Sequence, residues 1–308
     1  MISRYGSAPE SFLRAQVIDE FRVSEKRKRL WAVEIDLYMH LAEVCEKNGL
    51  RFFANGGTLL GAARHKGFIP WDDDIDIAMP WPDYKALQYL WSEFHEPYFL
   101  QSYLTEENAS AGYMRLRRSD TTGCTQWEHN NIVDADFNRG IFIDIFPLFY
   151  VPESDDERLA QKEQVMKYWK ILRGYDAVLQ KESGMPGYNK EYEQYIELYE
   201  RCPEKNNLKL LKEKYLASCA MCNDSHLVGL TAHRVHKREL IWELSWHEET
   251  VMLPFEYTQM RCPIGYEKIL ETMYGDWRTP VRGIEIHSMY AVDPDLPYLQ
   301  AKGGESLD

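Results

Sequence analysis

Apolar residues recur at helical spacing in the first part of the chain. Over residues 28–47 they lie three or four positions apart, which is the spacing of one face of a helix. They are Leu30, Val33, Leu37, Leu41 and Val44. Asn48 and Gly49 follow directly, and both residue types are common at helix C-termini. The pattern predicts a helix over 28–47 that packs against a sheet beginning at Leu50.

Short apolar or alternating runs predict the strands of that sheet. They cover residues 50–54, 74–77, 98–102, 113–117 and 140–148. The last of these, GIFIDIFPL, is apolar except for Asp144. A buried carboxylate is costly unless it is paired or binds a metal, so Asp144 is a candidate site residue. The alternative is an aspartate that bonds to backbone at a strand end.

Beyond Pro152 the pattern becomes helical. It predicts helices over 155–180, 188–201 and 204–222. Near the C-terminus it predicts one short helix that begins with Pro263 and stops at Gly275. We therefore divide the chain into an N-terminal arm (1–27), a mixed α+β core (28–150), a helical lobe (151–250) and a C-terminal segment that packs back on the core (251–308).

The densest group of acids follows Trp71, in the run WDDDIDI. If 74–77 is a strand, the side chains of Asp74 and Asp76 point to one face, and Asp72 shares that parity. Carboxylates at this spacing repel one another unless a cation lies between them. The run therefore predicts a Mg²⁺ or Mn²⁺ site, and it lacks the spacing of an EF-hand calcium loop.

A glycine pair precedes these acids. The run NGGTLLGAAR over 55–64 predicts a tight turn and then a helix with Thr58 as its N-cap. Gly56 and Gly57 would let backbone amides approach a phosphate at the helix N-terminus. Three basic residues follow, namely Arg64, His65 and Lys66. Such a turn alone is common, but next to the acid run it indicates phosphate chemistry.

Arg115 and Arg117 share one face of the predicted strand over 113–117. Guanidinium groups bind phosphate oxygens through two parallel hydrogen bonds. We expect both side chains to hold the phosphates of a donor, with a solvated edge strand as the alternative.

Composition and charge exclude several classes of protein. A chain of 308 residues with 44% hydrophobic residues is globular, and its net charge of −13 argues against a protein that coats nucleic acid. No run of 18 apolar residues and no signal-peptide pattern occurs. We therefore expect no transmembrane segment and a cytoplasmic location, compatible with peripheral contact at the inner face of a membrane. The six cysteines fit reduced thiols, and zinc at Cys219 and Cys222 is not expected.

Several runs together resemble a known family. GGTLLG (56–61), RH (64–65) and GFIPWDDDIDI (67–77) are similar to the signature of the LicD phosphotransferases, relatives of fukutin-related protein. FIDIFP (142–147) resembles the segment that carries the third acid of this family. YGD at 274–276 with Pro280 resembles its closing segment, although Trp277 departs from it. The resemblance is strong over 30–150 and moderate over 251–281.

This resemblance implies a nucleotidyltransferase-like fold, in which helices flank a mixed sheet as in the DNA polymerase beta-like enzymes. It implies Mg²⁺-dependent transfer of a substituted phosphate, such as phosphocholine, from a CDP-alcohol such as CDP-choline, with release of CMP. The acceptor would be a hydroxyl of a cell-surface glycan, such as a teichoic acid, a lipopolysaccharide or a lipid-linked glycan. Asp74, Asp76 and Asp144 would be the catalytic and metal-binding acids, with Asp72 as an additional candidate ligand. The donor would contact Gly56, Gly57, Thr58, Arg64, His65, Lys66, Trp71, Arg115 and Arg117.

Two other functions fit the same residues. A nucleotidyltransferase would use these acids to attack the α-phosphate of a nucleoside triphosphate and would release pyrophosphate. A non-catalytic, glycan-binding relative would keep only the fold, and the presence of all three acids argues against it. The donor distinguishes the first two enzymes, and the run PWDDD (70–74) favours the CDP-alcohol.

Overall fold

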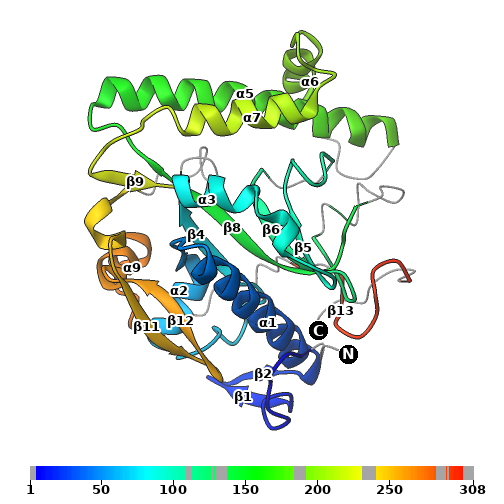
Figure 1. Cartoon of the computed structure of the whole chain (residues 1–308), viewed down its shortest axis with the longest axis vertical. Coiled ribbons are helices and arrows are strands. Elements are labelled where there is room, and N and C mark those ends of the chain that lie inside the picture. Colours follow the sequence, from blue (N-terminus) through cyan, green and yellow to red (C-terminus); the bar gives the residue numbers. More distant parts are fainter. Residues whose placement is uncertain are drawn as a thin grey trace.

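The computed structural model describes residues 5–108, 112–125, 128, 137–183, 192–230, 241–281, 289 and 291–300. Its centre is a seven-stranded mixed sheet (Figure 1). The strands are β3 (Phe53–Ala54), β4 (Asp76–Pro80), β5 (Tyr98–Gln101), β6 (Met114–Arg118), β8 (Ile141–Tyr150), β9 (Leu227–Gly229) and β10 (Ile241–Glu243). This sheet with flanking helices confirms the expected α+β fold.

Strand β8 organises the sheet. It pairs in parallel with β4 and antiparallel with β6 and β9. Its side chains are buried on both faces up to Phe149, which explains the nearly continuous apolar run. Strand β6 lies between β5 and β8 and is buried throughout. The alternative of a solvated edge strand for Arg115 and Arg117 is therefore wrong.

Helix α1 (Glu25–Lys47) crosses one face of the sheet and contacts β6 and β8 (Figure 1). The Ser24 hydroxyl caps its start by accepting the N–H of Arg27 at 3.2 Å. Its end at Asn48 and Gly49 is the one that the sequence predicted, and Gly49 has a φ of +65°. Before α1, the arm forms a small hairpin of β1 (Gln16–Ile18) and β2 (Phe21–Val23).

Helix α2 (Gly56–Arg64) contacts β4 and the hairpin of β11 (Thr250–Phe255) and β12 (Thr258–Pro263). Pro263 belongs to β12, and the following helix α9 (Tyr266–Tyr274) starts after Gly265, so the helix start predicted at Pro263 is wrong. The predicted stop at Gly275 is confirmed, with a φ of +68°.

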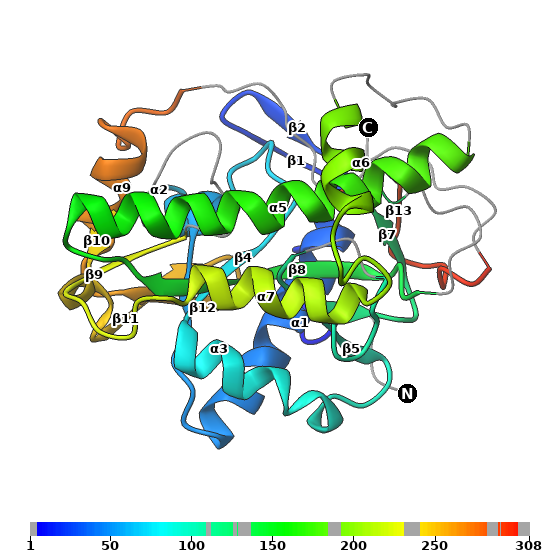
Figure 2. The same ribbon diagram turned by 90° about the horizontal axis from the view of Figure 1, so that it is seen from above.

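The helices of the lobe are α5 (Asp155–Ser183), α6 (Glu193–Glu200) and α7 (Leu208–Cys219). Helices α5 and α7 run side by side along one end of the sheet (Figures 1 and 2). The remaining elements are α3 (Trp81–Gln88), the 3₁₀ turns η1 (Trp91–Glu93) and η3 (Leu244–His247), and the pair β7 (Thr122–Cys124) and β13 (Ala291–Asp293). Across the described ranges, no helix is both long enough and apolar enough to cross a membrane.

Candidate active site

Three polar residues form one row across the sheet. Asp76, the first residue of β4, is the register partner of Asp144 on β8. Asp144 is in turn the register partner of Arg115 on β6. Directly opposed residues on neighbouring strands project to the same face of a sheet. The sheet thus brings together two predicted acids that lie far apart in the sequence.

The remaining acids lie in a turn before β4. Strand β4 starts at Asp76, so the prediction of a strand from residue 74 is wrong. The prediction that Asp74 and Asp76 project to one face of a strand is therefore wrong as well. The carbonyl of Asp72 instead accepts hydrogen bonds from Arg27 Nη1 at 3.1 Å and Trp31 Nε1 at 3.0 Å. The amide of Asp144 donates to the carbonyl of Ile75 at 3.0 Å. Helix α1 and strand β8 therefore hold this turn from two sides.

The carboxylates of the turn are close enough to share one cation. One oxygen from each of Asp72, Asp73 and Asp74 lies within 4.8 Å of the others. Burial raises the pKa of Asp72 well above its usual range, and the facing charges of Asp74 and Asp73 raise this pKa further. Oxygen donors grouped in this way fit a hard divalent cation such as Mg²⁺. The sequence did not single out Asp73, because in a strand its side chain would point away.

The glycine pair lies directly against two of these acids. A Cβ atom at Gly57 would lie 2.4 Å from Asp72 Oδ2, and one at Gly56 would lie 2.8 Å from Asp76 Oδ2. Gly56 also has a φ of +55°, which side-chain-bearing residues rarely adopt. Only glycines therefore let the N-terminus of α2, with its unpaired amides, approach the carboxylates this closely.

Thr58 contributes to the site in a way that differs from the prediction. The N-cap of α2 is Asn55, so the assignment of Thr58 as N-cap is wrong. The hydroxyl oxygen of Thr58 accepts the backbone N–H of Asp76 at 2.8 Å. This contact fixes the start of β4 against α2.

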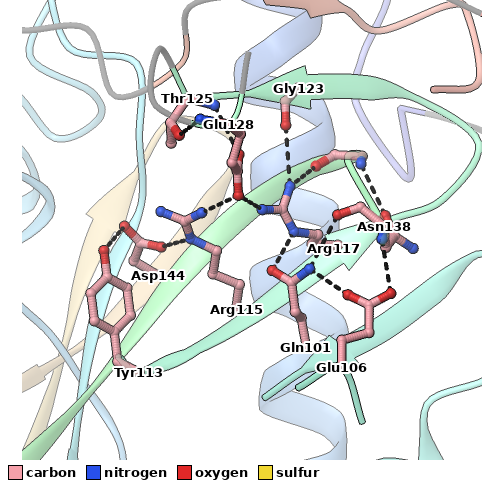
Figure 3. A network of polar contacts seen from close by, with 11 residues as sticks. Gln101, Glu106, Tyr113, Arg115, Arg117, Gly123, Thr125, Glu128, Asn138 and Asp144 are labelled. Atoms are coloured by element: carbon pink, nitrogen blue, oxygen red, sulfur yellow. Dashed lines mark hydrogen bonds and ion pairs between the residues drawn. The ribbon is translucent and has the colours of Figure 1, made fainter. Parts of the chain in front are cut away.

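Two residues hold the carboxylate of Asp144 in place, namely Arg115 on β6 and Tyr113, which directly precedes β6 (Figure 3). Its Oδ1 accepts from Arg115 Nε at 2.8 Å, and its Oδ2 accepts from the Tyr113 hydroxyl at 3.2 Å. Burial raises the pKa of Asp144, and the positive charge of Arg115 opposes this rise. Burial also raises the pKa of Tyr113, so its phenol remains a donor. The role of Tyr113 in orienting Asp144 was not predicted.

A buried glutamate joins the two arginines of β6 (Figure 3). One oxygen of Glu128 accepts from Arg115 Nη1 at 2.8 Å and from Arg117 Nη2 at 2.6 Å. Burial alone would raise the pKa of Glu128, but Arg117 and Arg115 outweigh it and hold this pKa below its usual range. Glu128 lies in a stretch without periodic pattern, so no signal in the sequence pointed to it.

Arg117 differs from Arg115 in that it is fully buried and bonded within the protein. Its Nε donates to Gln101 Oε1 at 2.6 Å, and its Nη1 donates to the carbonyls of Gly123 and Gly140 at 3.2 and 2.8 Å. Together with Glu128, these acceptors use all three nitrogens. The geometry therefore gives Arg117 a role in supporting Glu128 and Arg115, and its contact with a donor stays a prediction.

The predicted basic residues lie at the far end of α2. Arg64 Nη1 donates to the carbonyl of Trp277 at 3.0 Å, and His65 Nε2 lies 3.3 Å from Asp19 Oδ2. Helix α2 has nine residues, which separates its two ends by about 13 Å. A role in donor binding for both residues stays a prediction.

Lys66 and Trp71 belong to the segment between the end of α2 and the acid turn. Lys66, with a φ of +57°, accepts the N–H of Glu256 at its carbonyl at 2.8 Å. The ring of Trp71 lies edge-on to His65 and Phe21, with centroid distances of 6.4 and 6.3 Å. Trp71 is only partly buried, so its ring can contact a ligand next to Asp72.

Residues 49–171 match the family described as "LicD/FKTN/FKRP, nucleotidyltransferase domain". This part of the chain is similar to the nucleotidyltransferase domain of the LicD family. The matched range contains the glycine turn, the acid turn, Arg115 and Asp144. The recognition made from the sequence is therefore confirmed.

Two named relatives are similar over parts of this range. The lipopolysaccharide cholinephosphotransferase LicD of Haemophilus influenzae is 39% identical over 93 residues, which are 30% of this chain and 33% of the relative. The ribitol 5-phosphate transferase FKRP of Homo sapiens is 48% identical over 40 residues, 13% of this chain and 8% of the relative. The chain thus spans about a third or less of the length of each.

Proposed function

We propose that this protein is a transferase of the LicD type, which moves a substituted phosphate from a CDP-alcohol to a hydroxyl of a cell-surface glycan and releases CMP. The observation that carries the proposal is the meeting of the α2 N-terminus with the acids of the turn and of β4. A helix N-terminus that begins with two glycines can bind a diphosphate through its backbone amides. The facing carboxylates bind the divalent cation that such a donor needs.

Asp74, Asp76 and Asp144, with Asp72, would hold Mg²⁺ or Mn²⁺. When bound, this cation would neutralise charge that develops on the diphosphate of the donor. The other steps belong to the chain itself. The amides after Asn55 would bind a phosphate oxygen, and the absence of a Cβ at Gly56 and Gly57 lets the carboxylates of Asp76 and Asp72 lie close to these amides.

In the transfer, the oxygen of the acceptor hydroxyl bonds to the phosphorus of the substituted phosphate. The bond from this phosphorus to the oxygen of the CMP phosphate breaks, and the electron pair leaves with CMP. The hydroxyl proton must pass to a base. Asp144 either completes the metal site or accepts this proton. Burial raises the pKa of Asp144, which makes its carboxylate a better base. Arg115 and Tyr113 hold its carboxylate in place for both roles.

The relatives support the class of the acceptor and leave the donor open. One is named for the transfer of a choline phosphate to lipopolysaccharide and the other for the transfer of ribitol 5-phosphate. We propose a glycan or lipid-linked glycan as acceptor here, reached from the cytoplasm at the inner face of the membrane. Trp71 is the side chain that we propose for recognising the alcohol, since a quaternary ammonium binds to aromatic faces.

A nucleotidyltransferase would use the same acids, and its products distinguish it from the proposed transferase. We would incubate the protein and Mg²⁺ with a glycan extract and with CDP-choline, CDP-ribitol, CDP-glycerol, CTP or ATP in turn. Release of CMP from one CDP-alcohol, together with phosphorus in the glycan, is the expected result. Release of pyrophosphate from CTP or ATP, with no reaction of any CDP-alcohol, would replace the proposal by the alternative.

A further inference from the structure

The outer face of α5 combines basic and apolar side chains. Six residues of this face follow one another at steps of one, three or four, so they lie on one side of the helix. They are Leu159, Lys162, Glu163, Met166, Lys167 and Lys170. Val165, on the other side of α5, is buried in one cluster with Phe149 of β8 and Tyr215 of α7. The outer face is therefore turned away from the sheet, at the edge of the molecule where α5 lies (Figure 1).

This outer face borders a hollow between α5, the end of α6 and α7. The hollow has a volume of about 850 Å³, and its walls are mostly apolar. Leu159 of α5 and Leu198 of α6 line it and are 57% and 44% exposed. Exposed apolar side chains gathered around one hollow mark a binding surface, because their burial by a partner is favourable.

Basic side chains outnumber acidic ones around this hollow. Five basic and two acidic residues line it among the described residues, although the net charge of the whole chain is −13. Two of the basic residues pair with neighbouring acids, namely Lys214 with Glu204 and Arg201 with Glu197. Lys167 and Lys170, in contrast, form no ion pair within the described ranges of the chain. These two lysines are therefore available to an anionic partner.

We propose that the hollow binds an anionic lipid of a membrane. The phosphate of the headgroup contacts Lys167 and Lys170. The acyl chain lies against Leu159, Met166 and Leu198. An apolar surface next to lysines is the combination that holds peripheral proteins at anionic membranes. The net negative charge of the whole chain favours contact through this face, because an anionic membrane attracts only the basic part of the surface.

Flotation with lipid vesicles tests the proposal on the whole protein. The vesicles would contain phosphatidylcholine alone or phosphatidylcholine with phosphatidylglycerol, at low and at high salt. We expect binding only to the anionic vesicles, and weaker binding at high salt, because salt screens the lysines. The measurement needs no donor, glycan or divalent cation, so its failure would leave the proposed transfer reaction untouched.

A charge reversal in the hollow has a matched control elsewhere. Lys167→Glu/Lys170→Glu should lower the affinity for anionic vesicles by about 25-fold, because each lysine at an anionic surface contributes about fivefold. Arg22→Glu/Lys268→Glu changes the net charge by the same amount at exposed positions of β2 and α9, away from α5 (Figure 1). This control should lower the affinity far less.

A second variant tests the apolar part of the hollow. Leu159→Gln/Leu198→Gln keeps every charge and removes the contact with the acyl chain. It should weaken binding by a similar factor at low and at high salt, because salt does not screen an apolar contact.

Three results would overturn the proposal. The first is a wild-type protein that does not bind anionic vesicles at low salt, which would favour an acidic protein segment as the partner. The second is a folded Lys167→Glu/Lys170→Glu protein that binds them as well as the control does. The third is unchanged binding of Leu159→Gln/Leu198→Gln, which would exclude the hollow as a lipid site. The first measurement uses the unchanged chain, so it decides the question even if a variant fails to fold.

Discussion

Asp76 and Asp144 are register partners on the parallel strands β4 and β8, and each is bound from outside its own strand. The backbone N–H of Asp76 is held by Thr58, and the carboxylate of Asp144 by Arg115 and Tyr113. These contacts fix the backbone of Asp76 and the carboxylate of Asp144 on neighbouring strands. We propose that this pair of acids faces a divalent cation.

Removal of either carboxylate should abolish transfer without unfolding the protein. Asp76→Asn should lower metal and donor affinity, whereas Asp144→Asn should lower turnover by roughly 10²–10⁴-fold if Asp144 is the base. In the second case the pH profile of the turnover number should lose its acidic limb. Asp83→Asn is the control, since Asp83 forms an ion pair with the exposed Arg51, away from the row of Asp76 and Asp144. An active Asp76→Asn enzyme would contradict the assignment.

Alanine substitutions at Gly56 in the glycine turn and at Gly49 at the end of α1 form a matched pair. Gly56 and Gly49 both have positive φ values, +55° and +65°, so alanine at either position costs about 1–2 kcal/mol in backbone strain. Only at Gly56 would the new Cβ meet a carboxylate, at 2.8 Å from Asp76 Oδ2, because Gly49 has open space around it. We expect both variants to lose unfolding free energy, Gly56→Ala more than Gly49→Ala because of this close contact, and we expect a loss of Mg²⁺ affinity only in Gly56→Ala. Equal Mg²⁺ affinities by calorimetry would show that the close approach has no role.

Because Glu128 pairs with two buried arginines of β6, removing its charge should destabilise the protein. Glu128→Gln leaves two buried guanidinium groups without their shared anion, and breaking a buried ion pair costs about 3–5 kcal/mol. Urea unfolding measures this loss. Glu93→Gln removes a partly exposed carboxylate that pairs with the exposed Lys47 and should lower the midpoint far less. If Glu128→Gln were as stable as the control, the network of Figure 3 would not support Asp144.

The pattern of the sequence predicted those elements whose structure is decided locally. Helix α1 and strand β8 have the periodicity and the continuous apolar run that their burial requires. The glycines at 56 and 57 and the acids at 76 and 144 stand out by residue type alone, and the structure places them together.

What the sequence could not predict depends on contacts between distant segments. Residues 74–77 alternate like a strand, but the strand starts only at Asp76, and the contacts of Asp72 with Arg27 and Trp31 hold the residues before it in a turn. Thr58 looks like a helix cap, yet its oxygen bonds to Asp76. Glu128 acquires its role only because β6 brings two arginines to it. No local propensity carries this information.

His247 should make the protein less stable in mild acid. Burial against Phe53 and Trp242 lowers the pKa of His247 to about 4. The folded state therefore resists the proton that the unfolded state binds below its pKa of about 6.5. The contribution, roughly 3 kcal/mol, is present above pH 6.5 and is lost as the pH falls toward 4.

Comparison with His247→Gln isolates this effect from that of the acids. Unfolding free energies of both proteins would be measured by urea titration at several values between pH 7.5 and 4.5. The wild type should lose its advantage over the variant as the pH falls. A difference between the two that does not vary with pH would mean that His247 is protonated equally in both states.

We propose that the α2 N-terminus and the acids of β4 and β8 form a metal-dependent site for a CDP-alcohol. The most direct test is thermal unfolding with Mg²⁺ and each of CDP-choline, CDP-ribitol, CDP-glycerol, CMP, CTP and ATP, for the wild type, Asp76→Asn and Asp83→Asn. A ligand at about 100 times its Kd stabilises the folded state by roughly 2.7 kcal/mol. We predict that one CDP-alcohol raises the midpoint only with Mg²⁺, in the wild type and in Asp83→Asn, and that Asp76→Asn abolishes the shift. Stabilisation by triphosphates alone, or a shift that persists in Asp76→Asn without Mg²⁺, would contradict the claim.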